Sequence, residues 1–307
     1  MIIPYIVSAI FFPDEESIPI HTRSEVIRRL ALLRKSNQRR ASLDEIIVKG
    51  RVQIQNISRE FPNLRFKELL IPRLEDTKQH LKGVRAHRIF HIEPELLYYL
   101  FYHSKPLPSG TVFNTKELGL EEADKALLHD PNVADSLYAG TLPRPEEAMP
   151  PSPQFVLCLD RVIFPDNVGS LIRSASGIGG VSAVLGTLGT CDFHGWKVLE
   201  STGGHGFGIP KKNGLSYTDV IAYARANRLL PIVGHSTAGV DPKEIRLTGS
   251  DHKGVMVIVG NEKHGPSQEL LDVSVQARIP INDRMNSLNV GVAGGILLQI
   301  ANSIQNR

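Results

Sequence analysis

The strongest constraint on the fold is a series of uninterrupted apolar runs in the second half of the chain. These runs occupy residues 155–159, 181–185, 229–233, 255–259 and 275–279. Each is followed by Gly, Asp or Pro and then by a segment of helical character. Strands that are apolar at nearly every position are buried on both faces, as in a parallel sheet covered by helices. The sequence therefore predicts an α/β domain with a parallel sheet over residues 154–307.

The last segment of the chain, residues 288–304, has the pattern of a helix. It is rich in small residues, at Gly291, Ala293, Gly294 and Gly295. Small side chains let a helix approach a neighbouring element closely, so we expect this helix to pack tightly in the domain.

The first half of the chain has a different organisation. Short apolar segments at 45–48, 66–71 and 87–91 alternate with helical segments at 52–59 and 94–101, which predicts a smaller α/β sandwich. Prolines and acidic residues are frequent over residues 118–153. Helix and strand interiors do not tolerate so many prolines, so this stretch is predicted to be a linker. With 307 residues, two domains are expected: 1–117, a linker over 118–153, and 154–307.

A net charge of +3 is too small to imply a polyanionic partner, but residues 22–51 are strongly basic. Val26, Leu30 and Leu33 share one stripe of a helix that Ser24 or Thr22 can cap. The basic residues on the opposite face of this helix are predicted to contact RNA. The alternative is that this face is simply exposed to water. The predicted RNA-binding residues are Arg28, Arg29, Arg34, Lys35, Arg39 and Arg40.

The cysteine and histidine patterns give no metal site. Cys158 and Cys191 are too few and too far apart for a disulfide framework or a cysteine-based zinc site, and they favour a reducing compartment. His194 and His205 lack partners at the spacing of metal ligands.

No apolar run approaches the length that spans a bilayer. The apolar start, residues 1–12, has no basic leader, which argues against a signal peptide. A cytoplasmic location is expected.

Three groups of polar residues follow the apolar runs, where α/β sheets form their binding sites. In the first group, Asp160 follows a run, and Asn167, Gly169 and Arg173 open the next helix. We expect Asn167 to cap that helix and Gly169 to allow close approach of a ligand.

The second group places Glu262 between Gly260 and Gly265, which let the backbone turn tightly. The third group contains Ser287 and Asn289, after the last run. These two residues can serve a reaction centre, cap the final helix, or do both. A Rossmann dehydrogenase is set aside, because no Gly-x-Gly-x-x-Gly follows a strand.

In this order, the three groups resemble the SpoU, or TrmH-like, class of SPOUT methyltransferases over residues 154–304. The resemblance implies a parallel sheet with a deep trefoil knot, a homodimer, and S-adenosylmethionine (SAM) held in the knot. The first half resembles, more loosely, the L30e-like RNA-binding domain that precedes the catalytic domain in many SpoU proteins.

The resemblance also implies roles for individual residues. The catalytic set is Asn167, Arg173, Glu262, Ser287 and Asn289, and the cofactor-binding set is Gly234, Gly260, Ile279 and Leu288. A guanidinium with a pKa above about 12 is a poor base, so Arg173 is expected to bind phosphate or orient the ribose. Glu262 is expected to accept two hydrogen bonds from Arg173. The chain departs from the family pattern at Lys263, Ile281, Asp283 and Gly291.

The function implied is methylation of a ribose 2′-hydroxyl in RNA. The two-domain layout favours ribosomal RNA (rRNA) over tRNA. The alternatives are a tRNA 2′-O-methyltransferase, a non-catalytic RNA-binding or ribosome-assembly protein with the same fold, and a methylase acting on a base or a small molecule.

Overall fold

The computed structural model describes residues 25–43, 45–72, 81, 83–101, 109–113, 155–247 and 251–305. These residues form two compact units. The first unit holds the described residues up to 113 together with His194–Phe207, and the second holds 155–193 and 208–305. The expected linker and the expected helix caps at Thr22 and Ser24 lie outside the described residues. The expected domain boundaries remain predictions.

The second unit is built on a six-stranded parallel sheet in the order β10-β8-β9-β5-β6-β7. All five apolar runs are strands, although the last is shorter than predicted, and a sixth strand is present. That strand, β7, escaped prediction because it lies at the sheet edge and its residues are mostly polar. The strands are β5 (Phe155–Leu159), β6 (Val181–Thr187), β7 (Lys211–Leu215), β8 (Leu229–Gly234), β9 (Gly254–Val259) and β10 (Val275–Ala277).

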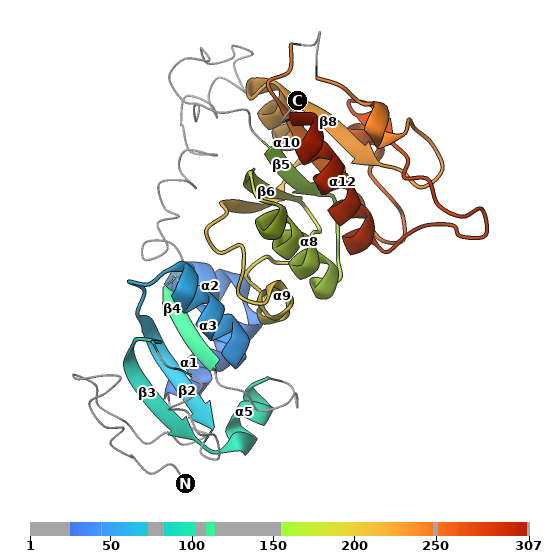
Figure 1. Ribbon diagram of the computed structural model, residues 1–307. Helices are drawn as coiled ribbons and strands as arrows, with labels where there is room; N and C mark the ends of the chain where they lie inside the picture. Colours follow the sequence, from blue (N-terminus) through green and yellow to red (C-terminus); the bar gives the residue numbers. More distant parts are fainter. Residues whose placement is uncertain are drawn as a thin grey trace. The chain divides into compact units, whose positions relative to one another are not determined.

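Helices pack on this sheet, and Figure 1 shows α8 and α12 running alongside one another. The predicted tight packing of α12 is confirmed at Gly294, where an added Cβ would lie 2.2 Å from Leu171 Cδ2 on α8. Helix α10 packs against Val156 and Met256 in the core of the sheet. The helices are α8 (Pro165–Ile178), α10 (Tyr217–Ala226), α11 (Gln268–Leu271), α12 (Val290–Gln305) and the 3-10 turn η1 (Pro242–Glu244).

The first unit has a four-stranded mixed sheet in the order β1-β4-β2-β3, in which β2 and β3 are parallel and the other pairs are antiparallel. The predicted strands and helices form close to their expected bounds, and β4 is additional. The strands are β1 (Glu45–Lys49), β2 (Phe66–Pro72), β3 (Ala86–Ile92) and β4 (Ser109–Phe113). The helices are α1 (Glu25–Lys35), α2 (Asn37–Leu43), α3 (Arg51–Glu60), α5 (Pro94–Leu100) and α9 (Trp196–Thr202). The L30e-like resemblance stays a prediction.

Helix α9 belongs to the first unit although its sequence lies between β6 and β7. Its Trp196 and Leu199 are buried in the two apolar cores of that unit. Lys49 of β1 is also buried, with its Nζ 3.1 Å from Glu200 Oε1 and 5.4 Å from the centre of the Trp196 ring. Asn56 of α3 donates to the Gly203 carbonyl at 2.8 Å. The core of the first unit is therefore completed by residues from the second half of the chain.

No described helix has the length and apolar character needed to span a membrane.

Candidate functional site

Three residues from distant parts of the chain form one hydrogen-bonded series. Asn289 Nδ2 donates to Asn167 Oδ1 at 3.0 Å, and Asn167 Nδ2 donates to Glu262 Oε1 at 3.0 Å. Asn167 lies on α8 after β5, and Glu262 follows the neighbouring strand β9. The series therefore lies at the carboxyl ends of adjacent parallel strands, the usual place for a site in an α/β sheet.

Glu262 also caps the amino end of α8. Its Oε1 accepts from the Phe164 N–H at 3.1 Å and its Oε2 from the Ile163 N–H at 3.2 Å. Phe164 is the N-cap residue and offers no side-chain acceptor, so a carboxylate from another segment takes that role. The positive end of the helix dipole favours this negative charge. The expectation that Asn167 caps α8 is wrong, because the helix already begins at Pro165.

The turn after β9 fixes Glu262 in place. Asn261 and Gly265 exchange two backbone hydrogen bonds, and Asn261 Oδ1 accepts from the N–H groups of Lys263 and His264 at 2.9 Å. Gly265 has a φ of +69°, which a residue with a side chain rarely adopts. The expected tight glycine turn is confirmed.

Asn289 has two roles. Its Oδ1 accepts from the N–H of Gly291 at 2.9 Å and of Val292 at 3.3 Å, which caps the start of α12. Its Nδ2 donates to Asn167. The capping interpretation of Asn289 is therefore confirmed, and its role in a reaction centre stays a prediction. Ser287, two residues earlier, is exposed.

Arg173 does not join the series. It is exposed on α8, and the expected Glu262–Arg173 pair is not formed, because Asn167 and two backbone N–H groups occupy the Glu262 oxygens. Six residues of an α-helix make about 1.7 turns, so Arg173 points about 120° away from Asn167 around the helix axis.

A buried network that the sequence reading did not anticipate supports the site. Asp160, directly after β5, accepts from the Ser267 N–H at 2.6 Å and from the Thr187 hydroxyl at 3.0 Å. Arg161 Nε lies 3.2 Å from Asp160 Oδ1. Arg161 has a φ of +53°, and its N–H is held by the hydroxyls of Thr187 and Thr190. The signal for this network in the sequence is an aspartate directly after an apolar run, and the structure shows that this aspartate is fully buried.

The predicted cofactor-binding residues also lie at the carboxyl edge of the sheet. Gly234 ends β8, Gly260 follows β9, and Ile279 follows β10, and these three strands are neighbours. Leu288 directly precedes Asn289. The side chains of Ile279 and Leu288 are half-buried, so they offer apolar surface beside backbone donors and acceptors. Such a lining suits an adenosine group.

The six predicted RNA-binding cations differ in exposure. Arg34 and Arg40 are buried and donate to the backbone carbonyls of Leu100 and Leu33, respectively. Arg29 pairs with two buried carboxylates, Glu45 and Glu68. These three arginines are committed to the fold because each holds a buried acceptor. The exposed members of the set are Arg28, Lys35 and Arg39.

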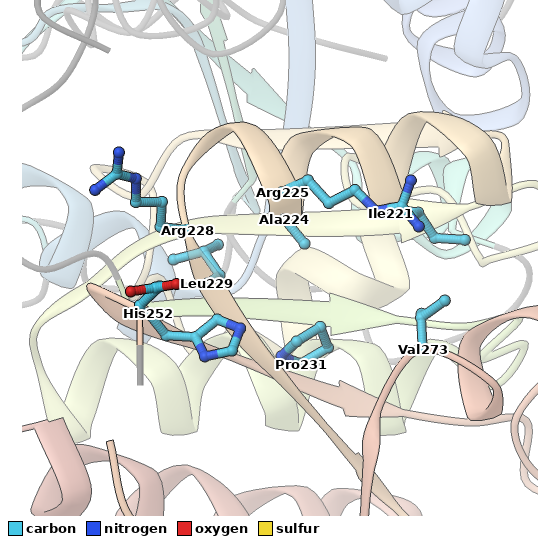
Figure 2. Close-up of a pocket in the computed structure, with 9 residues that line it drawn as sticks. Ile221, Ala224, Arg225, Arg228, Leu229, Pro231, His252 and Val273 are labelled. Carbon is cyan, nitrogen blue, oxygen red and sulfur yellow. The ribbon is translucent and has the colours of Figure 1, made fainter. Parts of the chain in front are cut away.

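A cavity of about 710 Å³ lies at the amino ends of β8 and β9, at the opposite edge of the sheet from Asn167. Figure 2 shows its lining, which includes Arg225 of α10, Pro231 of β8 and His252 before β9. None of the predicted site residues lines it. Within the described part of the chain, no group of His, Cys, Asp and Glu side chains gathers as metal ligands would.

One known protein family matches the second half of the chain. Residues 154–299 match the SpoU rRNA Methylase family. Over this stretch, just under half of the chain, the sequence is similar to SpoU methylases. The predicted resemblance is thus confirmed for this part of the chain.

Curated relatives are similar to about half of this chain. The 23S rRNA (adenosine(1067)-2′-O)-methyltransferase of Streptomyces laurentii is 31% identical over 144 residues, which cover 47% of this chain and 52% of that protein. The 23S rRNA (guanosine(2553)-2′-O)-methyltransferase RlmP of Bacillus subtilis is 34% identical over 149 residues, covering 47% of this chain and 56% of that one. The chain spans about half the length of these relatives.

Solved structures confirm the predicted α/β fold. The SpoU methyltransferase AviRb from Streptomyces viridochromogenes, solved in complex with the cofactor AdoMet (SAM), aligns with a TM-score of 0.68 and 19% identity. The alignment covers 92% of this chain and 98% of AviRb.

Proposed function

We propose that this protein transfers a methyl group from SAM to a ribose 2′-hydroxyl of RNA. The observation that carries the proposal is the series Asn289–Asn167–Glu262, which joins three motifs of the SpoU-like stretch at one edge of the sheet. Both curated relatives described above are named as 2′-O-methyltransferases, which supports the same reaction here.

The series gives the site a fixed polar centre. Asn167 is held through both ends of its amide group, so its orientation is set before a substrate binds. Glu262 fixes the start of α8 through two backbone N–H groups. Arg173 is exposed on the same helix and permanently cationic, so it is suited to bind a phosphate or orient the ribose.

The cofactor is proposed to lie against Gly234, Gly260, Ile279 and Leu288. Bound SAM supplies a methyl group on a sulfonium sulfur, which an oxygen nucleophile can accept. The half-buried side chains of Ile279 and Leu288 provide apolar walls, and the backbone of Gly234 and Gly260 provides hydrogen-bonding groups. The AdoMet complex of AviRb supports this choice of cofactor.

We further propose that residues 288–305 form part of a trefoil knot and that the protein acts as a homodimer. The outward direction of Arg173, which does not meet Glu262 in its own chain, supports a site completed by a second copy. Removal of residues 288–307 is expected to abolish both SAM binding and folding. SAM binding retained by such a truncation contradicts the knot.

The proposed substrate is rRNA, in keeping with the names of the two curated relatives. The proposed location is the cytoplasm. The exposed cations of α1 and α2 support an RNA-binding role for the first unit. A tRNA substrate is the alternative. A non-catalytic RNA-binding protein is favoured only by the departures at Lys263 and Asp283.

The test is transfer of a labelled methyl group to unmodified rRNA and tRNA transcripts by the wild-type protein, Arg173→Ala and Arg225→Ala. Arg225 is a matched control, because it is also an exposed helical arginine but lies at the opposite edge of the sheet. We expect Arg173→Ala to lose about 100-fold in rate, as for other removed transition-state contacts, with unchanged unfolding. Arg225→Ala should stay within about twofold of wild type. An unaffected Arg173→Ala rejects the site, and an inactive wild type favours the non-catalytic alternative.

A further inference from the structure

An exposed aromatic ring stands beside the polar series. The N–H of Phe164 and Nδ2 of Asn167 both donate to the same oxygen, Glu262 Oε1, at 3.1 and 3.0 Å. The two nitrogen atoms therefore lie no more than about 6 Å apart. Phe164 is nevertheless 54% exposed. A residue with a large apolar side chain is thus open to solvent directly beside the polar series.

The backbone that carries this ring is rigid. The N–H groups of Ile163 and Phe164 are both held by Glu262. Pro165 follows, and its ring fixes its own φ and confines the preceding residue to extended conformations, as observed for Phe164. The backbone that carries the ring is therefore anchored by the same carboxylate that holds Asn167.

We propose that Phe164 stacks on the base of the nucleotide whose ribose is methylated. This inference rests on the proposed function, because it places the target ribose at Asn167. Proteins that act on single-stranded or extruded RNA nucleotides hold the base by stacking on aromatic side chains. Stacking accepts any base, so Phe164 positions the nucleotide without selecting its sequence. Ile163, which is also exposed, extends the apolar surface beside the ring.

The charges next to Phe164 are mixed, since Lys263, which follows Glu262, and Asp166, which follows Pro165, are both exposed. Lys263 is suited to a phosphate that flanks a bound base. Phe164, the Asn167 amide and Lys263 thus offer contacts to the base, the ribose and a phosphate of one nucleotide.

The test compares Phe164→Ala, Phe164→Leu and Phe164→Tyr in methyl transfer to the unmodified rRNA transcript and in direct binding of the same transcript. Leu188→Ala is the control, because Leu188 is an exposed apolar residue that follows β6 at the same edge of the sheet. We expect Phe164→Ala and Phe164→Leu to raise the KM and Kd for RNA about tenfold, as for loss of one stacked base. The kcat and the KM for SAM should stay within about twofold of wild type, because the stack is present in both ground and transition states. Phe164→Tyr and Leu188→Ala should behave as wild type.

Three outcomes of the Phe164 variants reject the stack. A wild-type KM and Kd in Phe164→Leu shows that apolar bulk, and not an aromatic face, is required. A change in sedimentation of Phe164→Ala assigns the ring to a subunit contact. Unchanged RNA binding by Phe164→Ala rejects the stack and leaves the proposed function standing. Absence of methyl transfer by the wild type rejects the proposed function instead. The binding measurement decides the stack in either case.

Discussion

Replacement of Gly294 by alanine tests how closely α12 must approach α8. A Cβ at this position would lie 2.2 Å from Leu171 Cδ2 and 3.2 Å from Val259 Cγ1, and both neighbours are buried. Overpacking of this kind costs about 1–3 kcal/mol, while alanine gains about 1 kcal/mol over glycine inside a helix. We therefore expect Gly294→Ala to lower the free energy of unfolding by up to about 2 kcal/mol.

The adjacent glycine provides the control. A Cβ on Gly295 would meet only Ser174 Oγ at 3.7 Å, an ordinary contact. Gly295→Ala should therefore gain about 0.5–1 kcal/mol from helix propensity. Urea unfolding with a constant m-value measures both changes. Equal changes of the same sign in the two variants would refute the packing argument.

The same pair of variants connects the packing to the site. Asn167 and Asn289 lie at the starts of α8 and α12, so a displacement of α12 lengthens the hydrogen bond between them. Gly294→Ala should therefore lower the rate of methyl transfer more than Gly295→Ala does. Equal rates in folded samples of the two variants would show that the asparagine pair does not depend on this contact.

Three further predictions concern other parts of the molecule. Glu200→Gln leaves the buried Lys49 without its counter-charge and should lower the free energy of unfolding by about 1–2 kcal/mol. Lys49→Met keeps the apolar part of the side chain and should lower it less. Thermal unfolding compares the two variants, and equal losses contradict this order. Burial raises the pKa of the Cys158 thiol, and the charge of Asp160 raises it further. At pH 8, iodoacetamide should therefore label Cys158 only in denatured protein. Labelling of Cys158 in native protein as fast as in denatured protein contradicts this prediction. The third prediction concerns the exposed cations Arg28, Lys35 and Arg39. Their combined replacement by alanine should reduce the salt dependence of RNA binding by about two to three in the log–log slope, and an unchanged slope removes them from the interface.

The parallel sheet was predictable because strands buried on both faces leave an unmistakable apolar run. The convergence of Asn167, Glu262 and Asn289 was predictable for a related reason: polar residues after such runs meet at one edge of the sheet. The prediction that Arg173 is the partner of Glu262 is wrong, and helix geometry gives the reason, since a spacing of six residues turns Arg173 away from Asn167.

Other features depend on tertiary packing that local patterns do not record. The basic stretch of α1 and α2 gave no sign that Arg34 and Arg40 are buried against backbone carbonyls. Similarly, the sequence of α9 does not indicate which unit it joins. Its place in the first unit involves the contact between Lys49 and the ring of Trp196. Such pairings join residues far apart in the chain, so neither partner alone indicates them.

The central claim is that the site methylates a ribose oxygen, and the identity of the product tests it most directly. RNA methylated by the wild-type protein with labelled SAM can be digested completely to nucleosides and separated by chromatography. The account predicts that the label elutes with a 2′-O-methylnucleoside and that Asn167→Ala, which breaks the series between Asn289 and Glu262, greatly reduces it. Label found on a base, or a 2′-O-methyl product formed equally well by Asn167→Ala, would contradict it.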